Sequence, residues 1–204
     1  YGAEVAPVTV VTAITQRHDA MHYSILAGKN AEHNTLGSIA TYSIRRTLAA
    51  ALRRALPQIH DLHVYLEPGF GSMAHIAISV GADAGIEPMA LIDAAFATGF
   101  PSPAGELPLS LITKRIVVVD DDVDVHDIAD VEWALWTRLA RAEKLRVIPD
   151  VRSWELERCA KPGTGSLRLA VDATVDREDL DKLRRTVIPG AERVRLADYL
   201  DAGP

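Results

Sequence analysis

The hydrophobic pattern of the chain changes abruptly between residues 114 and 136. A continuous apolar run at residues 115–119, rich in β-branched side chains, predicts a strand that is buried on both faces. Acidic residues follow at once, and apolar residues then recur at helical spacing over residues 128–139. Asp127 stands where an N-cap residue belongs, so the segment predicts a strand, an acidic loop and a helix. In open α/β sheets, ligands usually bind at the carboxyl end of such a strand.

Other stretches of the chain show two further hydrophobic patterns. Alternating or Val-rich runs predict strands at residues 5–15, 62–67, 74–80, 145–150 and 167–171. Apolar residues at helical spacing predict helices at residues 36–55, 87–99 and 176–185. Three prolines in residues 100–108 predict a loop. Strands that alternate with helices over residues 1–204 predict a single α/β domain, with a mixed or mostly parallel sheet flanked by helices.

Composition narrows the classes of protein that fit this pattern. Hydrophobic residues make up 48% of the chain and charged residues 25%, as in ordinary globular domains. A net charge of −6 without a basic stripe disfavours nucleic-acid binding, and no apolar run is long enough to span a membrane. The single cysteine, Cys159, excludes an internal disulfide and suits a reducing compartment, so we expect a cytoplasmic protein. Because the sequence begins with Tyr1 rather than Met, we expect either a removed leader or a piece of a longer protein.

The acidic residues after the central run allow two interpretations. Asp120, Asp121 and Asp122 carry the oxygen ligands that Mg²⁺ prefers, and they resemble the acidic site of a phosphate-accepting receiver domain. The alternative, which each position favours locally, is that these side chains cap turns and the following helix. The seven histidines show no clustered ligand spacing, so we expect no dedicated metal site in this chain.

The sequence contains no complete set of catalytic residues. It lacks a GxSxG nucleophile motif, and the Gly-rich turn at residues 161–165 does not end in the GK[ST] of a P-loop. The order of Cys159, the histidines and the acids is not specific enough to indicate a thiol nucleophile. Taken residue by residue, the sequence therefore predicts an α/β domain without a self-contained active site.

Four blocks of the chain have a distinctive order and spacing. They are TAITQRHDA with the following His22 and Ser24, Glu32-His33 with Leu36-Gly37, VVVDDDVDV with its downstream DV, WA and TR pairs, and LAVDAT. Together these blocks cover most of the chain, and they resemble the C-terminal portion of the UbiD family of decarboxylases. One block alone would not be specific, whereas four in the same order are.

The resemblance implies chemistry that depends on prenylated FMN. Enzymes of the UbiD family reversibly decarboxylate aromatic, heteroaromatic or α,β-unsaturated acids, and the cofactor carries out the difficult step. In the family, a preceding split-barrel domain mainly holds the flavin, a divalent Mn or Mg ion and K⁺, and it also supplies the Glu-Arg-Glu acid/base network. The N-terminal and split-barrel domains are not in this chain, so the resemblance implies that it has no catalytic residue or metal ligand and is inactive alone.

The resemblance also implies where this chain would meet the substrate and the cofactor. One wall of the substrate pocket would be formed by Glu32, His33, Leu36, Trp154 and Leu156. Lys114 would approach the cofactor phosphate. Ordinary structural roles are the alternatives: core packing for Leu36, loop anchoring for Trp154 and a solvated strand edge for Lys114.

Partners follow from the same resemblance. We expect a small aromatic or unsaturated acid as substrate, an N-terminal catalytic region or subunit, and further copies of the chain in a homodimer or higher homo-oligomer. A non-catalytic assembly or regulatory subunit of such an enzyme is the alternative function. The third interpretation is a phosphate-accepting or Mg²⁺-binding module built on the three aspartates at residues 120–122.

Overall fold

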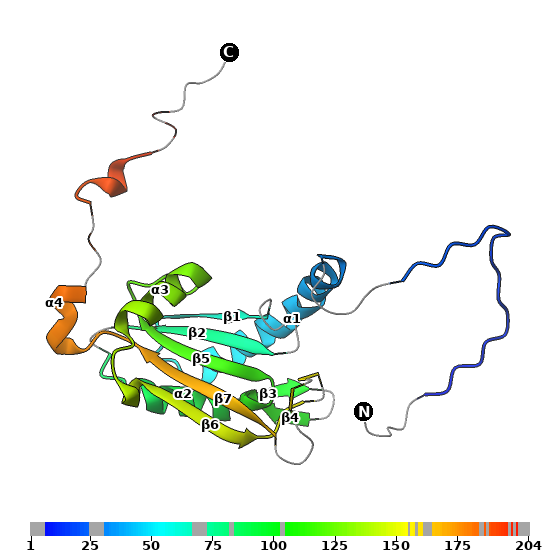
Figure 1. Cartoon of the computed structure of the whole chain (residues 1–204), viewed down its shortest axis with the longest axis horizontal. Coiled ribbons are helices and arrows are strands. Elements are labelled where there is room, and N and C mark those ends of the chain that lie inside the picture. Colours follow the sequence, from blue (N-terminus) through cyan, green and yellow to red (C-terminus); the bar gives the residue numbers. More distant parts are fainter. Residues whose placement is uncertain are drawn as a thin grey trace.

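A five-stranded mixed sheet forms the centre of the computed structural model (Figure 1). The structure describes residues 7–24, 31–66, 73–81, 84–102, 105–154, 156–157, 159–160, 165–183, 186, 188–195, 197 and 199. The strands of the sheet, in spatial order, are β1 (Asp61–Tyr65), β2 (Ala74–Val80), β5 (Thr113–Asp120), β7 (Ser166–Ala173) and β6 (Leu145–Val151). The α-helices are α1 (Ala31–Ala55), α2 (Pro88–Ala97), α3 (Ile128–Arg138) and the short α4 (Leu180–Leu183), which follows a 3-10 turn at Arg177–Asp179.

The three central strands run parallel, and the two outer strands run against them. β2 pairs with β5 and β5 with β7 in parallel, whereas β1 and β6 are antiparallel to their neighbours. The carboxyl ends of β2, β5 and β7 therefore meet at one edge of the sheet, and their starts meet at the other. The prediction of a mixed α/β sheet flanked by helices is confirmed.

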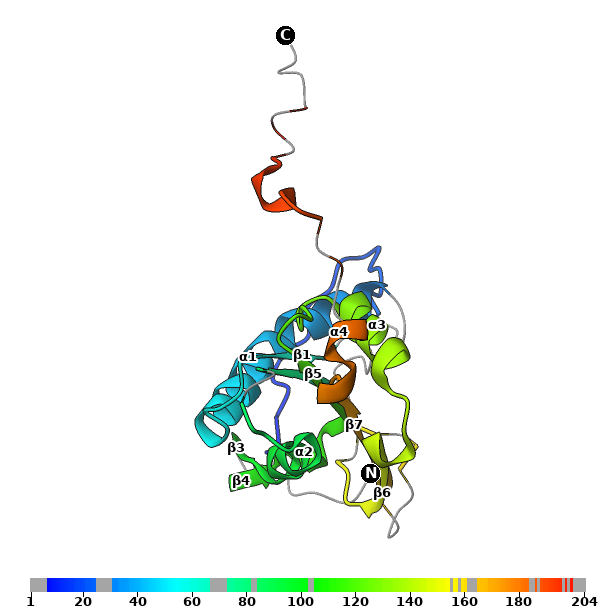
Figure 2. The ribbon, with the colours of Figure 1, turned by 90° about the vertical axis from the view of Figure 1, so that its left-hand side faces the viewer.

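The helices α1 and α2 cover one face of the sheet (Figure 2). The C-terminal half of α1 buries Leu48 and Leu52 there, and α2 buries Ile92 against Ile116 and Val118 of β5. The carboxylate of Glu87 accepts hydrogen bonds from the first free N–H groups of α2, whose Pro88 needs no such partner. The predicted helices at residues 36–55 and 87–99 thus exist because an apolar stripe on each meets the same buried face.

Helix α3 covers part of the opposite face. Its Val131 and Ala134 pack against Val117 and Val119 of β5, so β5 is buried on both faces, as its unbroken apolar run predicts. The side chain of Asp127 accepts a hydrogen bond from the main-chain N–H of residue 129, which confirms its predicted N-cap role. No helix among the residues described above is long and apolar enough to cross a bilayer.

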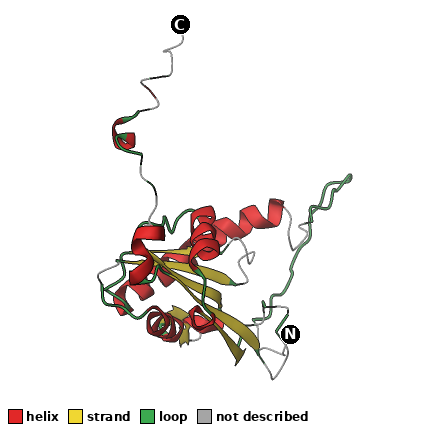
Figure 3. Ribbon diagram, turned by 60° about the vertical axis from the view of Figure 1, so that its left-hand side comes forward, coloured by secondary structure: helices red, strands yellow, loops and turns green. Residues whose placement is uncertain are grey.

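The predicted strand at residues 5–15 is wrong over the part that the structure describes. Residues 7–24 have no regular secondary structure and lead away from the sheet (Figures 1 and 3). The large apolar side chains of this arm are exposed: Val8, Val10, Val11, Ile14, Met21 and Tyr23. Alternation of Val and Thr supplies the side chains of a strand, but the hydrogen bonds must come from a neighbouring strand, and no described strand pairs with the arm.

The predicted loop at residues 100–108 is also wrong. Its described residues form a two-stranded ribbon of β3 (Gly99–Ser102) and β4 (Gly105–Pro108), paired antiparallel. Proline is tolerated in a ribbon of two edge strands, because each strand needs only one row of hydrogen-bond donors. The proline count therefore misled the prediction at this point.

Candidate functional site

The starts of β5 and β7, together with residues 152–160 after β6, form what we call the amino edge of the sheet. Val151, the last residue of β6, pairs with Ser166, the first residue of β7, so the chain after β6 stays beside this edge. The main-chain N–H of Trp154 donates to the carbonyl of Leu111, at 3.4 Å, just before β5. Lys114 is the second residue of β5. The structure thus brings Lys114 and the segment that carries Trp154 and Leu156 to one place.

A glycine allows the chain to return to this edge. Gly165 has φ +70, a left-handed conformation that favours glycine, and a Cβ there would stand 2.4 Å from the carbonyl oxygen of Val151. Any other residue would push β6 and β7 apart at the point where they bracket residues 152–160. The other four residues of the predicted Gly-rich turn, 161–164, lie outside the described part of the chain.

Glu157 is the centre of the polar contacts at the amino edge. Its side chain is 3% exposed, and one carboxylate oxygen accepts hydrogen bonds from Lys114 Nζ at 2.5 Å and Ser166 Oγ at 2.7 Å. The other oxygen accepts from Ser153 Oγ and, at 3.1 Å, from the guanidinium of Arg168. A single buried carboxylate therefore joins β5, β7 and the segment after β6.

The second buried charge at this edge is Arg168, whose side chain has no solvent exposure. Its guanidinium donates to Glu157 and to the main-chain carbonyl of Ser110 at 2.7 Å. It also reaches the carbonyls of Leu111 and Arg152, each at 3.4 Å. Arg168 thus binds the turn before β5 to the segment that contains Trp154.

The pKa of the Glu157 carboxyl reflects this environment. Burial raises the pKa, but hydrogen bonds from Lys114, Ser153 and Ser166 and the charge of Arg168 outweigh burial and lower it to about 2, from 4.5. A lowered pKa in the folded state means that the unfolded chain binds the proton first. The stabilisation is therefore fully present above about pH 4.5 and is lost as the pH falls toward 2.

We expect the free energy of unfolding to depend less on pH below about 4.5 when Glu157 is replaced by Gln. In the unchanged chain the free energy of unfolding should fall by on the order of 2 kcal/mol between about pH 4.5 and 2 through this group. Urea unfolding at several pH values measures it. Glu132→Gln, which removes a partly exposed partner of Arg115, is the control. Equal acid limbs in Glu157→Gln and the unchanged chain would contradict the assignment.

The remaining predicted pocket residues lie on the N-terminal half of α1. This half extends past the sheet on the side of the amino edge (Figure 1). The carboxylate of Glu32 accepts a hydrogen bond from Tyr23, and Leu36 is about half exposed, so Leu36 does not belong to the core. The side chain of His33 lies outside the described part of the chain. Glu32 and Leu36 are thus on the same side of the molecule as Trp154 but on a different element.

The carboxyl edge, where β2, β5 and β7 end, holds a cavity of about 380 Å³. Asp120 at the end of β5 and Asp172 near the end of β7 line it, together with residues around the start of α2. This is where the strand pattern predicts polar groups to gather. The cavity lies at the opposite edge from Lys114 and Trp154.

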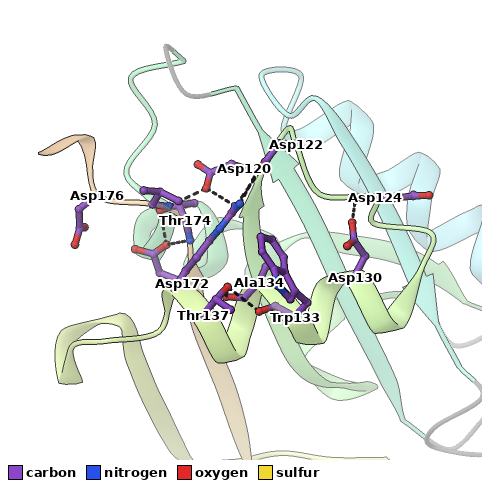
Figure 4. A network of polar contacts seen from close by, with 12 residues as sticks. Asp120, Asp122, Asp124, Asp130, Trp133, Ala134, Thr137, Asp172, Thr174 and Asp176 are labelled. Atoms are coloured by element: carbon purple, nitrogen blue, oxygen red, sulfur yellow. Dashed lines mark hydrogen bonds and ion pairs between the residues drawn. The ribbon is translucent and has the colours of Figure 1, made fainter. Parts of the chain in front are cut away.

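Asp120 and Asp122 at the carboxyl edge, labelled in Figure 4, form ion pairs with Arg138 of α3. Its buried guanidinium donates to Asp120 at 2.8 Å and to both oxygens of Asp122 at 2.9 and 2.7 Å, and it lies over the ring of Trp133. Asp120 also accepts from the main-chain N–H of Val175, at 2.8 Å. Burial raises the pKa of Asp120, which the hydrogen bond from Val175 and the charge of Arg138 oppose.

These contacts revise both interpretations of the acidic run. Asp120 and Asp122 pair with an arginine from α3 rather than capping a turn, whereas Asp124 does cap locally by accepting from the N–H of His126. Within the described part of the chain, no group of three acidic, histidine or cysteine side chains is placed to hold a metal ion.

Sequence reasoning missed Glu157, Arg168 and Arg138. A signal existed for the two arginines. Arg168 is in phase with Ala170 on β7, so it points to the face covered by α1 and α2, and Arg138 continues the stripe of Val131 and Ala134 on α3. A charged residue in phase with a buried face predicts a buried ion pair. Glu157 gave no signal, because residues 152–160 have no period.

The fold is an open, mixed α/β domain with a buried ion pair of Glu157 and Arg168 at its amino edge. A family model described as the 3-octaprenyl-4-hydroxybenzoate carboxy-lyase C-terminal domain matches residues 38–173. The chain therefore belongs to the UbiD family.

Similar proteins agree with this membership. Anhydromevalonate phosphate decarboxylase from Aeropyrum pernix is 31% identical over 184 residues, which are 90% of this chain and 38% of the relative. Gallate decarboxylase from Lactiplantibacillus plantarum is 28% identical over 94% of this chain and 37% of its own length. The UbiD-class enzyme HmfF from Pelotomaculum thermopropionicum, solved in complex with FMN, superposes with a TM-score of 0.62 at 28% identity, covering 83% of this chain and 34% of that one. The chain spans only 32–38% of the length of such relatives.

Proposed function

We propose that residues 1–204 form the C-terminal domain of a prenylated-FMN-dependent decarboxylase. Its substrate would be an aromatic, heteroaromatic or α,β-unsaturated carboxylic acid, and the reaction would be reversible. The observation that carries the proposal is the match of residues 38–173 to the carboxy-lyase domain, shared with decarboxylases over about nine-tenths of the chain. The flavin and the acid/base groups would belong mainly to a region outside residues 1–204.

In this proposal the amino edge faces the substrate. Leu156 is about half exposed, and Trp154 packs partly against the core below α1, so the pair offers an apolar surface backed by the sheet. A flat, apolar acid suits such a wall. Glu32, His33 and Leu36 would extend it from α1. Exposed apolar side chains of β6 and of the start of β7 supply candidate oligomer contacts: Leu145, Val147 and Leu167.

This chain would contribute one contact to the cofactor rather than a complete binding site. The prenylated flavin, when bound, supplies the electron sink for loss of CO₂. An ammonium has three N–H donors, and Lys114 uses two on Glu157 and Ser166, so one remains for an anionic group. The carboxylate of Glu157 beside it weakens attraction to a phosphate. Lys114 and Glu157 therefore fit a supporting contact to the flavin. The Mn or Mg ion and K⁺ would be held by residues outside this domain.

The test is turnover by the full-length gene product, produced with a prenyl-flavin supply and screened for CO₂ release from gallate, other aromatic acids and anhydromevalonate phosphate. Trp154→Ala should lower kcat/KM about 10- to 100-fold, because the wall of the pocket collapses. The control Trp136→Ala removes an equally large ring that is 82% exposed on α3 and should change kcat/KM less than about twofold. Flavin-loaded protein that releases no CO₂ from any acid would contradict the proposed function.

A non-catalytic assembly subunit is the second candidate, and the exposed apolar arm favours it. Val8, Val10 and Ile14 are all at least 78% exposed, and Ile39 and Tyr42 on α1 are exposed as well. A surface of this kind fits another protein chain. The intact mass of the native gene product separates the two candidates, because a subunit would have about the mass of this chain, and the fused enzyme would be two to three times heavier.

A further inference from the structure

The segment after β6 carries two of the proposed pocket residues but has little structure of its own. Residues 152–154 adopt neither helix nor strand. Within the segment, the N–H of Glu157 donates to the carbonyl of Trp154, at 3.2 Å, and the N–H of Ala160 donates to the carbonyl of Glu157, at 3.0 Å. Such single turns do not fix a segment in water. Its position therefore depends on what binds it to the rest of the domain.

Glu157 supplies most of that binding. One oxygen receives Lys114 of β5 and Ser166 of β7, and the other receives Ser153 from the segment itself and Arg168 from β7. Arg168 in turn donates to the carbonyl of Arg152. The start of the segment and its middle are thus held through one carboxylate and its arginine.

We propose that Glu157 is a positioning residue, which fixes Trp154, Leu156 and the ammonium of Lys114 relative to one another and so sets how tightly the acid substrate binds. This inference rests on the proposed function. Glu157 does not act on the substrate itself, because its carboxylate is buried and both of its oxygens already accept hydrogen bonds from neighbouring side chains. Its effect passes through the neighbours that it holds.

The charge of Glu157 also determines how Lys114 is presented. With two N–H groups directed to Glu157 and Ser166, the third is the only one left for a ligand, and its direction follows from the other two. Without Glu157 the ammonium of Lys114, which is about one-third exposed, would keep only its hydrogen bond to Ser166, and Arg168 would remain buried without its counter-charge. Loss of the carboxylate therefore disturbs the charged contact and the apolar wall together.

The first test measures the position of Trp154 directly and needs no turnover. The chain has three tryptophans, so Trp133→Phe with Trp136→Phe leaves Trp154 as the only one. In this background, at a temperature where the protein is folded, Glu157→Gln should raise the acrylamide quenching constant of Trp154 about two- to threefold, because the segment opens locally. Glu132→Gln, which removes the surface partner of Arg115, should leave the constant unchanged.

The second test separates positioning from a general loss of structure. In the full-length enzyme, Glu157→Gln should raise KM for the acid about tenfold and change kcat less than about threefold, since the reacting groups are elsewhere. Glu157→Asp keeps the negative charge on a shorter side chain. Its KM should rise by no more than about threefold, which is half of the tenfold effect on a logarithmic scale. Ser166→Ala removes one donor to the carboxylate and gives a milder variant if Glu157→Gln does not fold.

The two tests distinguish the inference from the proposed function. An unchanged quenching constant of Trp154 in both Glu157→Gln and Ser166→Ala would overturn the positioning role, whatever the activity. The positioning role would also be overturned if Glu157→Gln raised the quenching constant of Trp154 but lowered kcat and left KM unchanged. An enzyme that never turns over would contradict the proposed function, while the quenching result would still decide whether Glu157 holds the segment.

Discussion

Replacing Arg138 by methionine should lower the free energy of unfolding by about 3 to 5 kcal/mol. The side chain of Arg138 is 1% exposed and neutralises Asp120 and Asp122 at the end of β5. Methionine fills much of the volume but leaves two carboxylates close together, one of them buried. Removing one partner of a buried ion pair destabilises the fold by more than the intact pair stabilises it. The remaining charge is desolvated and has no opposite charge to compensate for the loss of water.

Urea unfolding at neutral pH measures this change. Arg141→Met is the matched control, because Arg141 is about half exposed and pairs with Asp176 and Glu178 at the surface, where solvent screens an ion pair and its loss changes stability little. Adding Asp120→Asn to Arg138→Met should recover part of the loss, since it removes the buried charge. If Arg138→Met and Arg141→Met lowered the free energy of unfolding by similar amounts, burial of the ion pair between Arg138 and Asp120 would have no special effect on stability.

The second large effect is expected at Arg168. Arg168→Met should lower the free energy of unfolding by about 3 to 4 kcal/mol, because it removes the guanidinium charge from the buried carboxylate of Glu157 and the hydrogen bond that Arg168 donates to the carbonyl of Ser110. Arg168→Lys should lower the free energy of unfolding by less than Arg168→Met does. It keeps the positive charge but not the planar guanidinium, which donates to several oxygens at once.

Arg53→Met serves as the control for Arg168, because the side chain of Arg53 is half exposed and pairs with Asp61 at the surface. We expect a change below about 1 kcal/mol there. Chemical denaturation followed by circular dichroism compares all three variants. If Arg168→Met were as stable as the unchanged chain, the buried contacts of Arg168 could not be what holds the turn before β5.

The buried elements of the fold were predictable from the sequence because each has a pattern of its own. The unbroken apolar run of β5 requires cover on both faces, and the acid before α3 fits an N-cap whatever surrounds it. The arm at residues 7–24 fails the same reasoning, because a strand needs a partner that hydrophobic alternation cannot supply. Similarly, prolines suggested a loop where β3 and β4 need only one row of donors each.

The candidate site was predictable only in part. Lys114 and Trp154 are 40 residues apart in the sequence, and they come together because β6 and β7 return the chain to the start of β5. Only the family resemblance pointed to both. The buried carboxylate between them lies in a segment without a period, so its environment depends on tertiary packing that the sequence pattern does not express.

The position of β7 also has a consequence for biosynthesis. β7 is the last of the described strands in sequence order, yet it lies between β5 and β6 and pairs with both of them. While the ribosome is still adding residues 166–173, β5 has an open inner edge and β6 has no neighbour at all. The sheet therefore closes only when the final strand emerges and inserts, and a nascent chain stopped before that point would expose two unsatisfied rows of main-chain groups to other polypeptides.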